Sequence, residues 1–508
     1  MSREQNPISR RRLLRSAGLL AGVAGAFGLA ACDTAPSGAG GPSGGGGPSA
    51  GGAGGPTGGT SGGTGPLLWW DQFNPLQDLQ KATFERFTAD GGPEVQYTVY
   101  NPAEQGQALQ LAQGSGQLPD VFTLAGVGVP AAVLRDQGWF SPLSTGDAIR
   151  DALPEGSLVP GIHVFDDQVY SFSIFSFRQY ETLLWFNRGL LERAGVDPEQ
   201  PPASWDDLRA AARAVQDAGS SGLILPLQFP DRLQAFVLEL AQTAGFPGSR
   251  ESGTNGIDLT TGEYRFHDDA FVEAIEFLLS FQQDGLLFPA STSLDARSGR
   301  ARWAADGAGF FLDGPYCAGV VAGDFAAFLP QLGVGAIPTP GGDAPVLTRP
   351  PTGGTFWASG QSDQVDQVSE LLTYLVDEEY QRGLAEAMDQ PPLDLAAVAG
   401  SDAHETYKQC IEFFAEQVFL GPSPQARAGV TAVEAAMTPV QPTLGDIVQG
   451  AFSGQVDDVR GALRTLSDGM TRAREAAIAQ VGGDVTAESW AFPDWSPGTD
   501  FGPEEYAG

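Results

Sequence analysis

Side chains that commonly act in catalysis are scattered along this chain of 508 residues rather than grouped in motifs. Its three histidines lack the H-x-H or H-x-x-x-H spacing of a zinc site, and a G-x-x-x-x-G-K-[ST] phosphate loop does not occur. Three matches to the hydrolase pattern G-x-S-x-G, around Ser43, Ser49 and Ser61, lie in a glycine-rich segment that offers no strand-turn-helix elbow. We therefore expect no enzymatic activity, no catalytic residues, no metal and no cofactor.

Carboxylates leave one enzymatic alternative open. The chain holds 62 Asp and Glu residues, and a retaining glycosidase needs only two carboxyl groups ~5 Å apart. An exported glycoside-acting hydrolase is therefore one alternative to solute binding. A sensor or scaffold that does not take part in transport is another.

The charge of the chain argues against a nucleic-acid partner. The formal net charge is -34, and the only lysines are Lys81 and Lys408. Neutralising a phosphate backbone requires clustered Lys and Arg. The acidity instead favours solubility.

The first 32 residues read as an export signal that ends on a cysteine. Arg10, Arg11 and Arg12 precede an apolar run that ends at Ala31. The paired arginines resemble a twin-arginine signal, and the sequence LAAC, which ends at Cys32, resembles a bacterial lipobox. We expect residues 1–31 to be removed and Cys32 to carry the lipid that anchors the protein to the outer face of the cytoplasmic membrane.

A tether and a long folded body follow the signal. Residues 32–66 are rich in Gly, Ser, Thr and Pro, which predicts a disordered tether. Residues 67–508 are long enough for two domains. Cys317 and Cys410 lie in apolar surroundings, and after export they could form a disulfide or stay as buried thiols.

Strand patterns alternate with amphipathic helix patterns in this body, which predicts an α/β fold with parallel sheet. Ser204 and Asp207 form a capping pair at the start of one helix. Strands are predicted at 66–70, 95–100 and 119–124, and helices at 76–87, 271–281, 365–384 and 456–478.

The order of several segments resembles the extracellular solute-binding proteins of ABC importers, in the branch similar to maltose-binding protein. The strand, A-G pair and helix start within Thr182–Ala212 are the most specific part. The other similar segments are PDVF at 119–122, LRDQGWFSPLS at 134–144, AADGAGFFLDGPY at 304–316, GVGAIPTPGG at 333–342 and PPTGGTFWAS at 350–359. One departure lies at 124–127, where LAGV replaces an aromatic and an acidic residue of maltodextrin binders.

This resemblance implies two α/β lobes joined by chain crossings, with a ligand held between them and hinge closure. Aligned by eye, lobe 1 comprises residues 67–180 and 355–420, and lobe 2 comprises 181–354 and 421–508. The implied partners are a small solute, such as an oligosaccharide or other sugar, and ABC permease subunits. We expect a monomer.

A sugar site needs aromatic plates and fixed polar groups. Carried over from the family by position, the ligand-binding candidates are Gln72, Phe73, Asn74, Tyr180, Glu181, Arg232, Phe236, Asp313, Tyr316, Phe356 and Trp357. Trp70 is a further candidate. Each aromatic ring among them could instead be part of the core. Glu181 could likewise hydrogen-bond the hinge backbone rather than a ligand.

Overall fold

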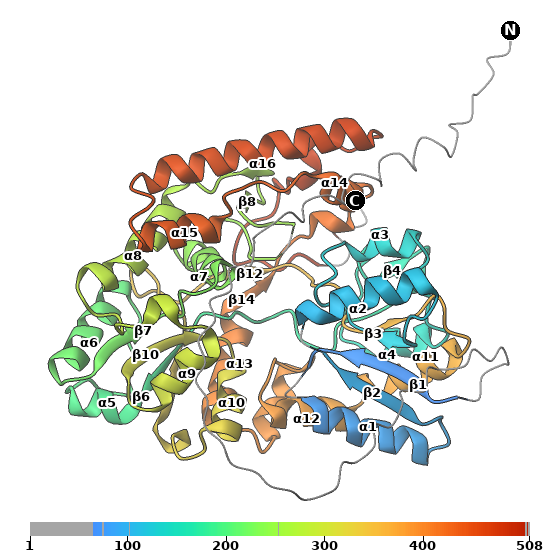
Figure 1. The fold of residues 1–508 in the computed structure, drawn as a ribbon, viewed down its shortest axis with the longest axis horizontal. Coiled ribbons are helices and arrows are strands. Elements are labelled where there is room, and N and C mark those ends of the chain that lie inside the picture. The colour runs from blue at the N-terminus through green and yellow to red at the C-terminus, as the bar shows by residue number, and fades with distance from the viewer. Residues whose placement is uncertain (1–64, 74–75, 101, 252, 503–504, 506–508) are drawn as a thin grey trace, which may run out of the picture. The chain divides into compact units, whose positions relative to one another are not determined.

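A computed structural model describes residues 65–73, 76–100, 102–251, 253–502 and 505 (Figure 1). The predicted signal, Cys32, nearly all of the tether and Asn74 lie outside these residues. Among the described helices, none combines the length and the apolar character needed to cross a membrane.

The first sheet has the strand order β13-β3-β1-β2. Its strands are β1 (Leu67–Asp71), β2 (Val95–Val99), β3 (Val121–Phe122) and β13 (Trp357–Ala358). β1 pairs in parallel with β2 and β3, whereas β13 is antiparallel to β3. Alternate side chains of β1 are fully buried, as expected for a strand covered more completely on one face.

Helices and a small hairpin accompany the first sheet. They are α1 (Gln77–Ala89), α2 (Pro102–Ser115), α3 (Ala131–Asp136), α4 (Gly146–Ala152), β4 (Val164–Phe165) and β5 (Gln168–Val169), with α11 (Val365–Thr373) and α12 (Glu378–Ala387) later in the chain. Two apolar clusters form the core here, one around Trp69 and one around Trp357.

The second sheet has the order β11-β6-β10-β7. Its strands are β6 (Leu183–Asn187), β7 (Ser221–Ile224), β10 (Ala308–Asp313) and β11 (Leu332–Gly335). β10 runs parallel to β7, and β6 is antiparallel to both β10 and β11. Every side chain of β6 and β10 is buried, which fits a sheet covered on both faces.

The helices around the second sheet include the one whose capping pair the sequence predicts. They are α5 (Arg188–Arg193), α6 (Trp205–Asp217), α7 (Pro230–Thr243), α8 (Asp269–Gln283), α9 (Ala296–Ala304) and α10 (Cys317–Asp324). Ser204 caps α6 by accepting from the N–H of Asp207 at 3.0 Å, as the sequence predicts. Figure 1 shows α5, α6 and α9 beside β6, β7 and β10.

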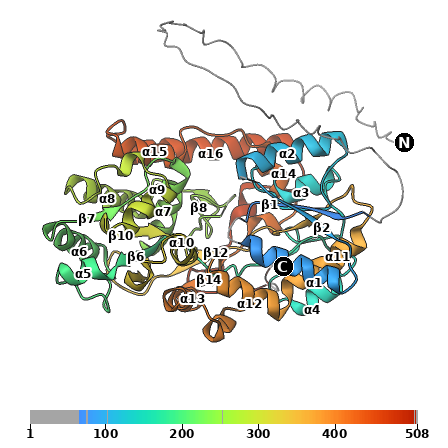
Figure 2. The same ribbon diagram turned by 60° about the horizontal axis from the view of Figure 1, so that its bottom comes forward.

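The last part of the chain is mainly helical. It contains α13 (Glu405–Gln417), α14 (Val430–Ala436), α15 (Leu444–Phe452) and α16 (Val459–Val481). The pairs β12 (Leu347–Arg349) with β14 (Val418–Leu420), and β8 (Ile257–Asp258) with β9 (Glu263–Tyr264), complete the strands. Helix α16 lies against both α14 and α15, which Figures 1 and 2 show beside different ends of α16. Within the described residues, short 3-10 turns lie at 291–293, 329–331, 374–376, 395–400, 424–426 and 487–490.

The single helix predicted for 365–384 is wrong. The segment is divided into α11 and α12, with a 3-10 turn at Tyr374–Val376 between them. Asp377 has an extended backbone and caps α12 by accepting from the N–H of Tyr380 at 2.8 Å. The apolar periodicity continues through this break because both helices pack on the same core, so the pattern alone did not reveal it.

The core also bears on the predicted lobe ranges. Tyr407, Cys410 and Phe414 of α13 belong to the apolar cluster of the second sheet, although the sequence analysis assigned residues 355–420 to lobe 1. The chain therefore returns to the second core before residue 420. Cys317 and Cys410 are both buried and free, so of the two alternatives for these cysteines the structure shows thiols.

Candidate functional site

A cavity of about 360 Å³ opens at one edge of the second sheet. The carboxyl ends of the parallel strands β7 and β10 meet there, together with the amino end of the antiparallel β6. This is the edge at which open α/β sheets commonly bind ligands. The lining residues are Glu181, Pro226, Phe229, Asp231, Arg232, Ala235, Arg250, Asp295 and Ala296.

Phe229 supplies an exposed aromatic face to this cavity. Pro230 begins α7 and has a fixed φ and no N–H, so the helix starts there. The residue before a proline is pushed toward extended backbone, and Phe229 has φ -114° and ψ 125°. Its ring is held outside the helix and is 55% exposed.

Arg232 lies at the floor of the cavity among three supporting side chains. It donates to the Tyr316 hydroxyl at 2.6 Å and forms an ion pair with the fully buried Asp313. Its guanidinium also lies 5.1 Å from the centre of the Phe236 ring. Burial opposes the charge of Arg232, but Tyr316 and Asp313 outweigh that effect and hold its pKa above the ordinary value. Arg232 is therefore a fixed cation.

Asp313 and Tyr316 reach Arg232 because β10 ends at Asp313. Gly314 and Pro315 follow the last residue of the strand, and proline has no N–H with which to continue a ladder. Asp313 also binds a second arginine, Arg300 of α9. The Nε of Arg300 donates to the Asp313 carboxylate at 2.8 Å. One buried carboxylate thus holds two guanidinium groups.

Glu181 and Arg250 form the other charged part of the cavity. Arg250 binds both carboxylate oxygens of Glu181, at 3.0 and 3.1 Å, and reaches Glu239 of α7 at 3.2 Å. Burial opposes ionisation of Glu181, but the charge and hydrogen bonds of Arg250 prevail and lower its pKa to about 2. The N–H of Glu181 itself donates to Glu239 at 3.0 Å. Glu181 is therefore ionised and fixed in position.

The first sheet places other predicted residues at its own carboxyl edge. Trp70 and Tyr100 are both partly exposed, with ring centres 5.0 Å apart. Gln72 accepts a hydrogen bond from Thr123, which itself accepts one from Gln105 at 2.8 Å. These groups offer an aromatic surface and a side-chain amide at the ends of β1, β2 and β3.

Five of the predicted ligand contacts are fully buried. Trp357 stacks on a neighbouring ring of the core, Phe140, with 4.2 Å between ring centres. The exposed fraction is 0–1% for each of Tyr180, Phe236, Asp313, Phe356 and Trp357. In this conformation they support the site or the core, and none presents a face to a solute.

The buried Tyr180 has internal hydrogen-bond partners. Its hydroxyl lies 3.0 Å from Gln417 and accepts from the N–H of Ile337 at 3.3 Å. Phe73 is partly exposed but packs edge-on against Phe175 and Phe356.

The sequence analysis missed seven of the nine lining residues, among them Phe229, Asp231, Arg250 and Asp295. Phe229, Arg250 and Asp295 lie in segments with no family motif that we could match. A local signal did exist for two of them. Phe229 precedes a helix-starting proline, and Asp295 caps α9 by accepting from the N–H of Ser298 at 2.7 Å.

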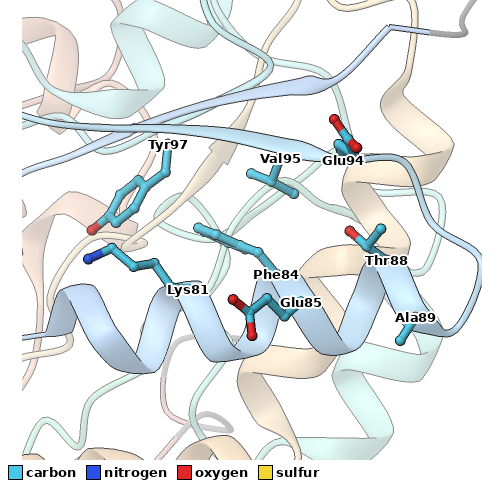
Figure 3. A pocket seen from close by; sticks show the side chains of 8 residues that line it. All are labelled: Lys81, Phe84, Glu85, Thr88, Ala89, Glu94, Val95 and Tyr97. Carbon is cyan, nitrogen blue, oxygen red and sulfur yellow. The ribbon is translucent and has the colours of Figure 1, made fainter.

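A second hollow lies elsewhere, between α1 and the edge strand β2 (Figure 3). It has a volume of about 550 Å³ and is lined by Lys81, Phe84, Glu85, Thr88, Ala89, Glu94, Val95 and Tyr97. Figure 3 shows these side chains between the helix and the strand. The groove reaches the amino end of β2 rather than the carboxyl edge of the sheet, so it is not part of the site described above.

Metal chemistry finds no support in the described residues. Within the ranges that the structure covers, His, Cys, Asp and Glu side chains form no group of three that could hold a metal ion.

Residues 70–382 match the family described as "Bacterial extracellular solute-binding protein". Curated relatives include the sn-glycerol-3-phosphate-binding periplasmic protein UgpB of Rhizobium meliloti (strain 1021). It is 23% identical over 301 residues, which cover 56% of this chain and 61% of that one. The UgpB of Brucella melitensis is 22% identical, over 50% of this chain and 61% of that one. The chain thus spans about three fifths of these relatives.

Solved structures with a similar fold include proteins described with bound sugars. The GacH receptor of Streptomyces glaucescens GLA.O, described unliganded and with acarbose, has a TM-score of 0.60 at 18% identity, covering 81% of this chain and 99% of that one. Maltose-bound MalE3 of T. maritima has a TM-score of 0.59 at 17% identity, covering 80% and 99%. A sugar transporter from Arthrobacter chlorophenolicus A6 with bound laminaribiose has a TM-score of 0.57 at 18% identity, again covering 80% and 99%. The α/β, two-lobed fold predicted from the sequence is confirmed.

Proposed function

Because the chain belongs to the bacterial extracellular solute-binding proteins, we propose that it is the substrate-binding component of an ABC importer for a sugar, such as an oligosaccharide. The protein captures the sugar between two lobes and delivers it to permease subunits. The sugar ligands named for three structures of similar fold support this choice of solute class.

The observation that carries the proposal is the exposed ring of Phe229 beside fixed carboxylates. A sugar ring has apolar C–H faces and a rim of hydroxyl groups, so it stacks on an aromatic plate and donates to carboxylates. Phe229 provides the plate, and Glu181 and Asp295 provide acceptors within the same cavity. Tyr316 is also partly exposed and lies beside Arg232.

The first sheet supplies the opposite wall in this proposal. Trp70 and Gln72 lie at its carboxyl edge, and Asn74 follows them in the sequence. A sugar that contacts both walls only in the closed state stabilises that state, since a ligand shifts an equilibrium by its difference in affinity for the two conformations. The ranges proposed for the lobes are 67–180 with 355–420, and 181–354 with 421–508. The packing of α13 on the second core supports an earlier end for lobe 1.

The proposal extends to the position of the protein in the cell. Family members are extracellular. We assign residues 1–31 to a twin-arginine signal, Cys32 to lipidation, and residues 32–66 to the tether that links the anchor to the folded body. The protein acts there as a monomer and without chemical turnover of the solute.

Thermal unfolding of the purified full-length protein in the presence of saccharides tests the function. Maltose, laminaribiose, acarbose and D-tagatose are suitable probes, because ligands that bind only the folded state raise Tm. A saturable rise in Tm with at least one of them, without release of products, is expected. No rise with any saccharide up to millimolar concentration would contradict sugar binding. Hydrolysis of a glycoside would contradict the absence of turnover.

A further inference from the structure

The two arginines that line the cavity are already bound to carboxylates of the chain. Arg250 holds Glu181 through two contacts and Glu239 through a third. Arg232 holds Asp313. Breaking a buried ion pair leaves a charge without its partner, which is strongly unfavourable. An anionic group of a solute would therefore have to compete with these carboxylates for either arginine.

The surrounding charges balance without a ligand. Arg300 shares Asp313 with Arg232, which leaves one positive charge in excess. Glu181 and Glu239 share Arg250, which leaves one negative charge in excess. The two groups are close enough for Glu181 to raise the pKa of Arg232. The network is thus neutral as a whole.

Further carboxylates make the cavity itself negative. Asp231 lies in the first turn of α7, and Asp295 caps α9. Hydrogen bonds from Ser298 hold the pKa of Asp295 below its ordinary value, so it is ionised. Both carboxylates lie where a helix N-terminus would otherwise favour an anion. The lining residues carry three negative charges and two positive ones.

One buried acid adds to this negative potential. Asp389 follows α12, and its side chain is almost fully buried. Burial and the charge of Glu181 raise its pKa to about 6. At neutral pH Asp389 is therefore ionised and adds a negative charge near Glu181.

We propose that this cavity takes a solute without an anionic group, a neutral polyhydroxylated molecule such as an unmodified saccharide, and rejects its phosphorylated form. The inference rests on the proposed function and narrows its solute class. It sets this protein apart from the curated relatives, whose names specify sn-glycerol-3-phosphate. A neutral sugar gains hydroxyl donors to Glu181, Asp231 and Asp295 without breaking any ion pair. A phosphate would meet repulsion from the same three groups.

Calorimetry on the full-length protein with matched pairs of compounds tests the inference. The pairs are D-tagatose with D-tagatose 6-phosphate, maltose with maltose 1-phosphate, and glycerol with sn-glycerol 3-phosphate. We expect at least one neutral saccharide to bind, and its phosphorylated form to bind on the order of 100-fold more weakly. Equal or tighter binding of any phosphorylated compound would overturn the inference but leave solute capture intact. Failure of every compound to bind would overturn the sugar-binding function, and this inference with it.

Two substitutions locate the source of the discrimination. Asp231→Asn and Asp295→Asn each remove a charge at similar volume, and asparagine can still cap α9. We expect each substitution to reduce the ratio of the Kd of the phosphorylated compound to the Kd of its neutral partner several-fold, mainly through tighter binding of the phosphorylated compound. Asp147→Asn on α4 is the matched control, because this exposed acid lies among the helices of the first sheet. An unchanged ratio in both variants would show that these carboxylates do not exclude anions.

Discussion

Replacing Phe229 with alanine is expected to weaken saccharide binding about tenfold while leaving the fold unchanged. The ring is 55% exposed, and an aromatic side chain has ~200 Å² of surface, so ~110 Å² is open to solvent. A sugar stacked on one face covers about half of that area. At ~25 cal/mol per Å², the lost contact amounts to ~1.4 kcal/mol, which is a factor of about ten in Kd.

The stability of this variant should barely change, because an exposed ring contributes little to the core. We expect a change within ~0.5 kcal/mol in the free energy of unfolding. Leu111→Ala on α2 is the matched control, since Leu111 is 76% exposed and lies outside the cavity lining. Phe229→Tyr keeps the aromatic plate and should retain binding.

Isothermal titration with the saccharides that bind the unmodified protein measures the effect. A Kd for Phe229→Ala equal to that of Leu111→Ala would refute the stacking role of Phe229. Tenfold weaker binding together with a large drop in Tm would also contradict the reasoning, because it would mean that the ring stabilises the fold.

Three further predictions concern the buried Trp357 and Asp389 and the partly exposed Glu181. Trp357→Ala should lower the free energy of unfolding in urea by ~3–5 kcal/mol, because it empties a core position; an unchanged midpoint with lost binding would instead make Trp357 a ligand contact. Glu181→Gln should lower the free energy of unfolding by ~3 kcal/mol at pH 7. Because the pKa of Glu181 falls from 4.5 to about 2 on folding, this difference from the unmodified protein should disappear as pH falls from 4.5 toward 2. Folding raises the pKa of Asp389 from 3.8 to about 6, so its charge destabilises the fold as pH rises through that range. Between pH 4 and pH 8, the free energy of unfolding of Asp389→Asn should therefore rise by up to ~3 kcal/mol relative to that of the unmodified protein. Equal pH profiles of unfolding free energy in the two proteins would contradict this.

The elements that the sequence predicts best are those whose signals are local. The helix capped by Ser204 is predicted and found, because a side-chain N-cap depends on residues only three positions apart. The strand that begins near Leu67 is also found, since an apolar run and its alternation depend only on neighbouring residues. The resemblance to the family also predicts the two-lobed fold and the loop that carries Asp313 and Tyr316.

The candidate site was predicted less well because exposure depends on tertiary packing. Trp357 and Phe229 are both large aromatic residues, yet the first is buried and the second is half exposed. Nothing in the local sequence separates them, because their environments are set by residues far away in the chain. The pairing of Arg250 with Glu181 is likewise a contact between residues 69 positions apart.

The central claim, that a solute closes the two lobes onto each other, can be tested most directly by a distance measurement. Spin labels at Leu111→Cys on α2 and Arg297→Cys on α9 mark the two sheets in a full-length Cys32→Ser chain. Cys317 and Cys410 are fully buried and should not react. We predict that a saccharide that raises Tm also shortens the label-to-label distance in proportion to occupancy. A distance that stays the same at saturating saccharide would contradict the account.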